Sequence, residues 1–228
     1  MHMRASIPPL HDQAALKGLI RSVLNGRERR IIPADNLNPA AVLVPLGWLD
    51  GDPRIILTKR SMNVETHKGE ISFPGGHTEP DDNGPENTAL REAQEEIGLK
   101  PEHVEILGRL DDHITIFRFH VTPVVGAIPY PYPFSINGEA DAIVTVRLAD
   151  ALLDSSWMSE KTQLRGMDVE FSCIPADDGF VWGATARMLR HFVELLTGHE
   201  LNPGPLSEDA RNWIAGIVGA QERYTQKL

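Results

Sequence analysis

The fold is decided by residues 75–99, which read GGHTEPDDNGPENTALREAQEEIGL. The second half of this stretch predicts a helix over residues 85–97. Pro85 suits the first turn of a helix, Gly98 suits its C-terminal cap, and Pro101 prevents the helix from continuing. A double glycine and a loop rich in acidic residues stand before the helix, where the backbone can approach a ligand closely.

Three carboxylates of this helix share one side. At about 100° per residue, Glu92, Glu95 and Glu96 fall within an arc of about 100°, next to an apolar arc that is expected to pack on a core. A Glu-rich helix face is commonly just solvated, but here Arg91 precedes Glu95 by four residues and can hold its carboxylate in place. Carboxylate oxygens gathered beside a buried face suit Mg²⁺ or Mn²⁺, so the helix is a candidate metal site.

The rest of the chain mixes strand and helix patterns. Helical spacing of apolar residues predicts further helices over residues 12–24, 183–196 and 208–220. Apolar and alternating runs predict strands at residues 40–46, 54–58, 103–110, 114–119, 121–128, 142–146 and 167–174, with loops at 61–76 and 129–133. The order is not a repeated strand–helix–strand pattern. We therefore predict an α/β fold of the α+β type, with a mixed sheet and helices on its faces.

Composition narrows the function. The chain has 228 residues, of which 22 are basic and 32 acidic, so its net charge is −10. Affinity for nucleic acid comes mainly from Lys and Arg that neutralise phosphates, so we expect no nucleic-acid partner, and we expect no membrane partner either. No run reaches the ~18 apolar residues of a membrane span, and the start of the chain lacks the apolar stretch of a signal peptide. These observations predict a cytoplasmic protein.

Several conspicuous residues outside the acidic helix receive structural interpretations. Cys173 stands in an alternating run and is interpreted as a plain strand residue rather than a nucleophile. The basic cluster at residues 27–30 is interpreted as a solvated turn. His113 and His120 flank a predicted strand and are interpreted as structural. Trp182 is interpreted as a packing anchor rather than a base-stacking residue.

The stretch 75–99 resembles the Nudix box, the signature of hydrolases that split a nucleoside diphosphate linked to another moiety. Residues 91–99 match the second half of the box at every fixed position. In the first half, Asp82 stands where the box usually has Glu, six residues after Gly76, and Arg91 lies one residue further on than in the commonest form. Both departures resemble the coenzyme A pyrophosphatase branch of the family.

A second signature of that branch lies upstream of the box. The branch carries Leu-Leu-Thr-x-Arg-Ser, a spacer, Gly, and then Phe-Pro-Gly-Gly. The matching residues here are ILTKRS at 56–61, Gly69, FPGG at 73–76, PVVG at 123–126 and WGATAR at 182–187. The resemblance therefore covers about residues 40–196.

One residue departs from the coenzyme A signature. The branch usually has Arg four residues after the Ser of the second signature, and this chain has Glu65. The change reverses a charge in the segment expected to favour coenzyme A. His67 and Lys68 stand nearby and are candidates to compensate for it.

The resemblance implies a Nudix-like α/β/α sandwich with a mixed central sheet. We expect an N-terminal helical extension at residues 1–36, a Nudix hydrolase domain at 37–200 and a C-terminal helical tail at 201–228. The implied activity is a metal-dependent pyrophosphohydrolase that converts coenzyme A, or a derivative, to 3′,5′-ADP and 4′-phosphopantetheine. Alternatives are hydrolysis of ADP-ribose, nucleotide sugars or nucleoside triphosphates, and a Nudix module that senses a nucleotide without cleaving it.

The resemblance also assigns roles to residues. The metal, Mg²⁺ or Mn²⁺, is expected on Glu92 and Glu96, with Glu95 and the backbone of Gly76 as further ligands. The general base is left open between the box and the loop before residues 142–146, and the catalytic candidates are Glu95, Glu139 and Arg91. The candidate substrate-binding residues are Arg60, Ser61, His67, Lys68, Phe73 and Gly75. The expected partner is a small-molecule nucleotide substrate, and a homodimer is left open.

Overall fold

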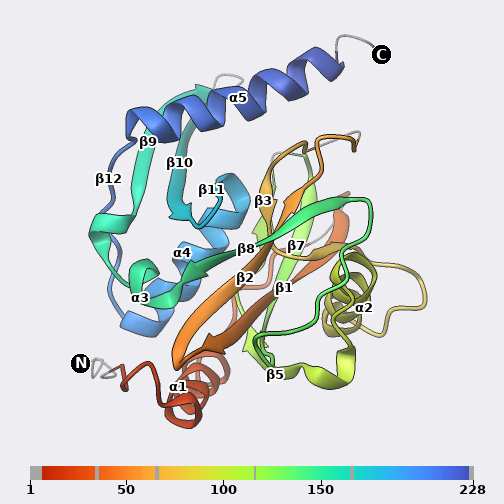
Figure 1. Ribbon diagram of the computed structural model, residues 1–228, viewed down its shortest axis with the longest axis vertical. Coiled ribbons are helices and arrows are strands. Elements are labelled where there is room, and N and C mark those ends of the chain that lie inside the picture. The colour runs from red at the N-terminus through yellow and green to blue at the C-terminus, as the bar shows by residue number, and fades with distance from the viewer. Residues whose placement is uncertain (1–6, 34–35, 65–66, 116, 165–166, 226–228) are drawn as a thin grey trace.

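The computed structural model describes residues 7–33, 36–64, 67–115, 117–164 and 167–225 (Figure 1). Its centre is an eight-stranded sheet whose main path runs β3-β2-β1-β7-β5. β1 and β7 pair in parallel and the other described pairs of this sheet are antiparallel, so the sheet is mixed, as predicted. The strands are β1 (Asn38–Leu49), β2 (Asp52–Arg60), β3 (Ile71–Ser72), β4 (Gly75–His77), β5 (Glu105–Arg109), β6 (His113–Ile114), β7 (Phe119–Ala127) and β8 (Ala140–Arg147).

Helices cover both faces of the central sheet. α1 (Gln13–Asn25) and α4 (Gly183–Thr197) lie on one face, and α2 (Pro85–Ile97) lies on the other. Successive side chains of a strand point to opposite faces, so Leu43 of β1 packs in the core under α2 while Val44 packs in the core under α1 and α4. The architecture is therefore the α/β/α sandwich that the resemblance implied.

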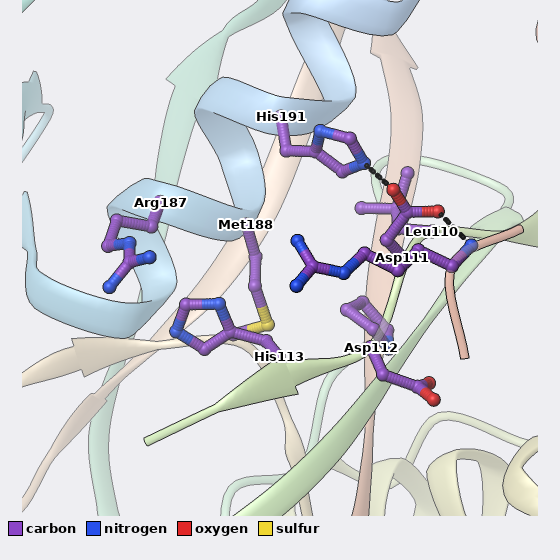
Figure 2. A pocket seen from close by; sticks show the side chains of 9 residues that line it. Leu110, Asp111, Asp112, His113, Arg187, Met188 and His191 are labelled. Atoms are coloured by element: carbon purple, nitrogen blue, oxygen red, sulfur yellow. Dashed lines mark hydrogen bonds and ion pairs between the residues drawn. The ribbon is translucent and has the colours of Figure 1, made fainter. Parts of the chain in front are cut away.

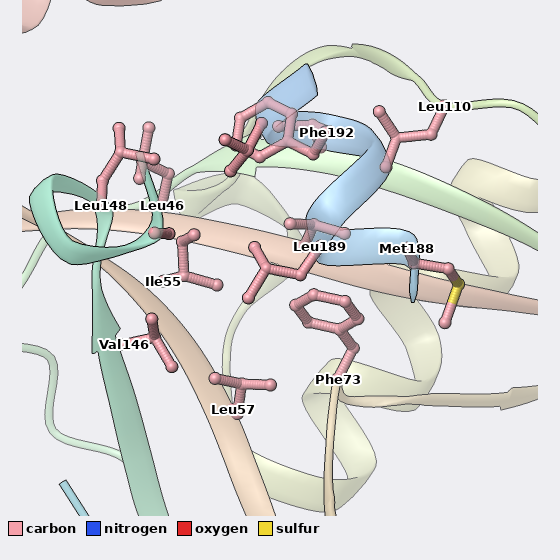
Figure 3. Packing of buried hydrophobic residues seen from close by; sticks show 14 of the residues in the cluster. Leu46, Ile55, Leu57, Phe73, Leu110, Val146, Leu148, Met188, Leu189 and Phe192 are labelled. Atoms are coloured by element: carbon pink, nitrogen blue, oxygen red, sulfur yellow. The ribbon is translucent and has the colours of Figure 1, made fainter. Parts of the chain in front are cut away.

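The core under α1 and α4 is the larger of the two. α1 starts after Asp12, whose carboxylate accepts a hydrogen bond from the Ala15 N–H at 3.0 Å, and it buries its predicted apolar stripe. Figure 3 shows Leu189 and Phe192 of α4 meeting the strand side chains, with Phe73 beside them. This packing joins the start of the chain to its last third.

A second, four-stranded sheet stands beside the central one and is crossed by α5 (Figure 1). Its order is β11-β10-β9-β12. Its elements are β9 (Met158–Leu164), β10 (Met167–Ala176), β11 (Gly179–Trp182), β12 (Gly204–Pro205) and α5 (Glu208–Thr225), and the short helices α3 (Leu148–Ala151), η1 (Pro101–His103) and η2 (Asp154–Ser156) complete the fold. Within the described part of the chain, no helix combines the length and the apolar character that crossing a membrane requires.

The structure corrects three of the predicted segments. The strand predicted over 103–110 starts only at Glu105, because Pro101–His103 form a 3₁₀ turn. The strand predicted over 114–119 is reduced to His113–Ile114, since Thr115 accepts a backbone bond from Arg118 in a tight turn. The loop predicted over 61–76 contains β3 and part of β4. The four predicted helices are confirmed.

The basic cluster at residues 27–30 is not a solvated turn, and that interpretation was wrong. The Arg27 guanidinium pairs with Asp111, and the Arg29 guanidinium pairs with Asp112. Both aspartates follow β5, more than eighty residues later in the chain. The segment is therefore fastened to the central sheet.

Cys173 and Trp182 both have surroundings that fit the structural roles predicted for them. Cys173 is a free cysteine, buried within β10, and burial raises the pKa of its thiol to about 12. Trp182 is half-buried at the end of β11, with its ring 6.0 Å from that of Phe171. Neither residue has the surroundings of a reactive or base-stacking group.

Candidate active site

The acidic helix α2 begins and ends where its sequence predicts. Gly84 precedes it with a φ of 95°, in the left-handed region that favours glycine, and Pro85 fills the first turn. Gly98 ends the helix in the left-handed conformation, with a φ of 67°, and its N–H donates to the Gln94 carbonyl at 3.0 Å. These caps fix the register that buries the apolar arc and sets the acidic residues beside it.

Arg91 ties the loop before α2 to the helix. Its guanidinium donates to the Asp82 carboxylate at 3.0 and 3.1 Å and to the His77 carbonyl at 2.8 Å. It also donates to Glu92 at 3.1 Å and to Glu95 at 3.2 Å. The Asp82 carboxylate is almost wholly buried, and the hydrogen bond from Arg91 lowers its pKa from the ordinary 3.8 to about 2. Arg91 is thus an organiser of the acidic residues.

The sequence did not predict a second partner of Asp82. The buried Thr88 hydroxyl donates to its carboxylate at 3.0 Å, and the Glu79 N–H donates at 2.9 Å. In the sequence, Thr88 is a polar residue directly before the apolar Ala89 of α2, and this position could have indicated a buried hydrogen bond. Its hydroxyl fixes the loop on the helix independently of Arg91.

The carboxylates of Glu92, Glu95 and Glu96 form an acidic row along one side of α2, and Glu96 is its most buried member. Its Oε2 accepts a hydrogen bond from the Gly75 N–H at 3.2 Å, so the double glycine and the helix meet here. Burial raises the pKa of Glu96 to about 7, and the nearby charges of Glu92 and Glu139 push it in the same direction. A buried carboxyl among other carboxyls is stabilised in its charged form by a cation.

Glu92 lies against the second glycine. A Cβ built on Gly76 would stand 2.6 Å from the Glu92 carboxylate carbon, so only glycine lets the two approach this closely. Burial raises the pKa of Glu92 as well, while Arg91 opposes that change. The Glu92 carboxylate thus fills the space beside Gly76.

Arg60 brings the upstream signature to the acidic helix. Its guanidinium lies 3.8 Å from the Glu96 carboxylate and 3.6 Å from that of Glu139. The loop of Glu139 is held on the end of α2, because the Asn137 N–H donates to the Glu96 carbonyl at 3.0 Å. The structure thus brings together residues that are 36–79 positions apart in the sequence.

Two candidate substrate-binding residues are buried. The Ser61 N–H donates to the Glu139 carbonyl at 2.8 Å, and its hydroxyl accepts from the Asn63 N–H at 3.2 Å. Phe73 is 3% exposed and packs in the core under α4. They lie beside the end of β2 and the start of β4, which carry Arg60 and Gly75.

The two candidate compensating residues lie on the loop after the upstream signature. The His67 ring lies 2.9 Å from the Glu70 carboxylate and meets the Phe117 ring edge-on at 5.1 Å. The Lys68 ammonium donates to the Met62 carbonyl at 3.2 Å. Glu65 lies outside the described residues.

The acidic row has the chemistry of a divalent-cation site, and its carboxylates are held by arginines. Among the residues that the structure describes, no three His, Cys, Asp or Glu side chains form a cluster that would hold a metal ion. Burial raises the pKa values of Glu92 and Glu96, and a cation beside these carboxyls would favour their charged forms. Glu95 and Glu139 are mostly exposed at the rim. Carboxylate oxygens of this kind are the donors that hard divalent cations prefer.

Comparisons with known proteins identify the family of the chain. The family model described as the NUDIX domain matches residues 38–163. The chain belongs to the Nudix family. Among curated relatives, the uncharacterized Nudix hydrolase NudL of Yersinia pestis (strain Pestoides F) is 35% identical over 156 residues, which are 68% of this chain and 78% of the relative. NudL of Yersinia pseudotuberculosis serotype O:1b (strain IP 31758) matches with the same values.

Solved structures of Nudix proteins are more distant. The Ap4A hydrolase binary complex of C. elegans is 22% identical with a TM-score of 0.43, over 50% of this chain and 83% of that one. The MutT/nudix family protein of Enterococcus faecalis is 14% identical with a TM-score of 0.45, over 94% of this chain and 92% of that one. The protein is a Nudix hydrolase, an enzyme that acts on nucleoside diphosphate-linked small molecules, and Nudix hydrolases generally use divalent metal ions.

Proposed function

We propose that this Nudix hydrolase is a cytoplasmic Mg²⁺- or Mn²⁺-dependent pyrophosphatase of coenzyme A or a derivative. The products are 3′,5′-ADP and 4′-phosphopantetheine. One observation carries the proposal: Arg60 of the upstream signature pairs with both Glu96 of the box and Glu139. The signature that resembles the coenzyme A branch is therefore part of the same site as the acidic helix.

In this proposal the carboxylates of Glu92 and Glu96 hold the metal, assisted by Glu95 and the backbone of Gly76. When bound, the metal neutralises the pyrophosphate charge and polarises the attacked phosphorus. Arg91 keeps the acidic row in register through its bonds to the loop and the helix.

Arg60 is placed to bind a substrate phosphate while it balances Glu96 and Glu139. Glu139 is 58% exposed and Glu95 is 57% exposed, so either carboxylate can take a proton from an attacking water. Replacing each by Gln distinguishes the two candidates, because loss of the general base removes the acidic limb of the pH–rate profile, where that carboxylate loses its proton.

The substrate is tested by identifying products. The purified enzyme is incubated with coenzyme A, dephospho-coenzyme A, ADP-ribose and nucleotide sugars, with Mg²⁺ and with Mn²⁺, and the products are identified by mass spectrometry. Release of 3′,5′-ADP from coenzyme A, faster than release from the other compounds, is the expected result. Equal or faster cleavage of ADP-ribose or a nucleotide sugar contradicts the assignment of coenzyme A as the substrate. It does not contradict the assignment of the protein as a hydrolase.

Glu65 favours a second class of substrate, namely compounds such as dephospho-coenzyme A or ADP-ribose that lack the 3′-phosphate of coenzyme A. Its charge is opposite to that of the Arg usual in the branch, and a carboxylate near the 3′-phosphate of coenzyme A repels it. Glu65→Arg is expected to lower KM for coenzyme A several-fold and to change KM for dephospho-coenzyme A much less, since the two compounds differ only in that phosphate. An equal response of both substrates means that Glu65 does not face the 3′-phosphate.

A further inference from the structure

A cavity of about 220 Å³ lies on the face of the central sheet that α1 and α4 cover (Figure 2). α4 forms one wall, and the segment after β5 forms the other. Basic side chains dominate its polar lining: Arg30, Arg187, His113 and His191. Figure 2 shows the Arg187 and His113 side chains next to each other on one side and His191 turned toward Asp111 on the other. α2 and its carboxylates lie on the opposite face of the sheet.

The two arginines of this cavity, Arg30 and Arg187, differ from the other described arginines in their contacts. Every other arginine side chain that the structure describes pairs with a carboxylate or donates to a backbone carbonyl. The guanidinium groups of Arg30 and Arg187 make neither contact with a described residue. In a chain of net charge −10, acidic partners are abundant, so two such cations in one cavity are a specific feature.

The aspartates that line the cavity do not neutralise these arginines. Asp111 already accepts from the Arg27 side chain and from the Arg30 N–H at 2.9 Å, and it lies 3.2 Å from the His191 ring. Asp112 is turned away and buried, with its partners Arg29, Ile32, His120 and Thr122. Each carboxylate is paired with an arginine outside the cavity lining, Asp111 with Arg27 and Asp112 with Arg29. The unpaired positive charge of the cavity is therefore that of Arg30 and Arg187.

His113 adds a neutral donor to the two cations. Burial lowers the pKa of His113 to about 4, and the charges of Arg187 and His191 push it in the same direction. A neutral imidazole keeps one N–H, which donates to an anion without adding repulsion. The group that this set of donors fits is an oxyanion with several acceptor oxygens.

We propose that this cavity binds a phosphate group, carried by inorganic phosphate or by a phosphomonoester. Guanidinium groups donate to phosphate oxygens through paired N–H groups, and such charge-assisted bonds are the strong ones. The site is separate from the Nudix box, because its walls lie on the other face of the sheet. It therefore holds a phosphate that is not being hydrolysed.

The test is a titration without divalent cations, so that the acidic row does not bind phosphate through a metal. Inorganic phosphate and glycerol phosphate are each titrated into the full-length protein, followed by calorimetry and by the ring resonances of His113. We expect saturable binding and a rise in the pKa of His113. Binding of inorganic phosphate at least as tight as that of glycerol phosphate identifies free phosphate as the ligand, and tighter binding of glycerol phosphate identifies a monoester.

Matched variants locate the binding. Arg187→Gln and Arg30→Gln are each expected to weaken phosphate binding about tenfold or more, the usual effect of losing a charge-assisted bond. Arg147→Gln makes the same charge change on an exposed arginine paired with Asp52, and it should leave the affinity unchanged. Glu92→Gln should also leave it unchanged.

Three results overturn the proposal. They are no saturable binding of either probe, equal weakening by the Arg147 variant, and loss of binding in the Glu92 variant. The last result places the phosphate at the Nudix box instead. Arg30 and Arg187 are both exposed, so their replacement leaves the core intact, and circular dichroism checks the fold of each variant.

Discussion

Replacing Arg91 by Gln should destabilise the protein in a pH-dependent way. Arg91 is the largest cause of the lowered pKa of Asp82, which falls from 3.8 to about 2. At about 1.36 kcal/mol per pKa unit, this difference corresponds to about 2 kcal/mol of folding free energy near neutral pH. The carboxylate is 6% exposed and the arginine 23%, so solvent screens the pair only in part. The Thr88 hydroxyl and the Glu79 N–H also lower this pKa and remain in the variant, so we expect Arg91→Gln to lower the free energy of unfolding by about 1 kcal/mol.

The pH dependence distinguishes this pair from a general loss of packing. The folded-state pKa of Asp82 is depressed, so its stabilisation is present above 3.8 and is lost as the pH falls toward 2. Urea denaturation of the wild type and the variant should give a difference at neutral pH that shrinks as the pH falls below about 4, where Asp82 takes up its proton. Arg147→Gln, which breaks an exposed pair with Asp52, is the control and should change stability far less. A difference that stays constant below the ordinary pKa of Asp82, or no difference at neutral pH, refutes the assignment.

Three further predictions concern the acidic row and the buried thiol. Gly76→Ala puts a Cβ 2.6 Å from the Glu92 carboxylate, so we expect turnover to fall more than tenfold, whereas Gly138→Ala, with nothing within 4 Å, should keep wild-type turnover; equal effects in steady-state assays contradict this. Glu92→Gln and Glu96→Gln should each reduce turnover by orders of magnitude at saturating Mg²⁺ with unchanged circular dichroism, and a near wild-type rate removes that residue from the metal site. Cys173, with its pKa raised to about 12, should resist alkylation at neutral pH until urea unfolds the chain, as followed by intact mass; rapid labelling of the folded protein contradicts its burial.

The acidic helix could be predicted because its determinants are local. Pro85 and Gly98 bracket it within one short segment, and the glutamate spacing sets its charged side. The resemblance placed the double glycine and the box in one site, and the structure adds the hydrogen bond from the Gly75 N–H to the Glu96 carboxylate. Features that depend on residues close together in the chain can therefore be predicted from the sequence.

The parts that the sequence did not reveal depend on distant partners. β9 reads MSEKTQL, a largely polar run, and it forms a strand because β10 and β12 pair with it on either side. The arginines at residues 27–30 looked solvated because their aspartate partners lie more than eighty residues away. Arg60 likewise finds Glu139 only through the folding of β2 against β8.

The docking of α1 has a consequence for the newly made chain. Its buried face packs on β5 and on α4, and α4 begins only at Gly183, so α1 is synthesised long before this second partner. The buried residues of this face are Leu16, Ile20 and Leu24, and until α4 is made the face has only part of its packing partners. Because the match to the family model starts only at residue 38, a chain trimmed to that boundary would lose this helix and leave apolar side chains of β5 and α4 uncovered. The contact between α1 and α4 therefore forms late in co-translational folding, although α1 precedes β1 in the chain.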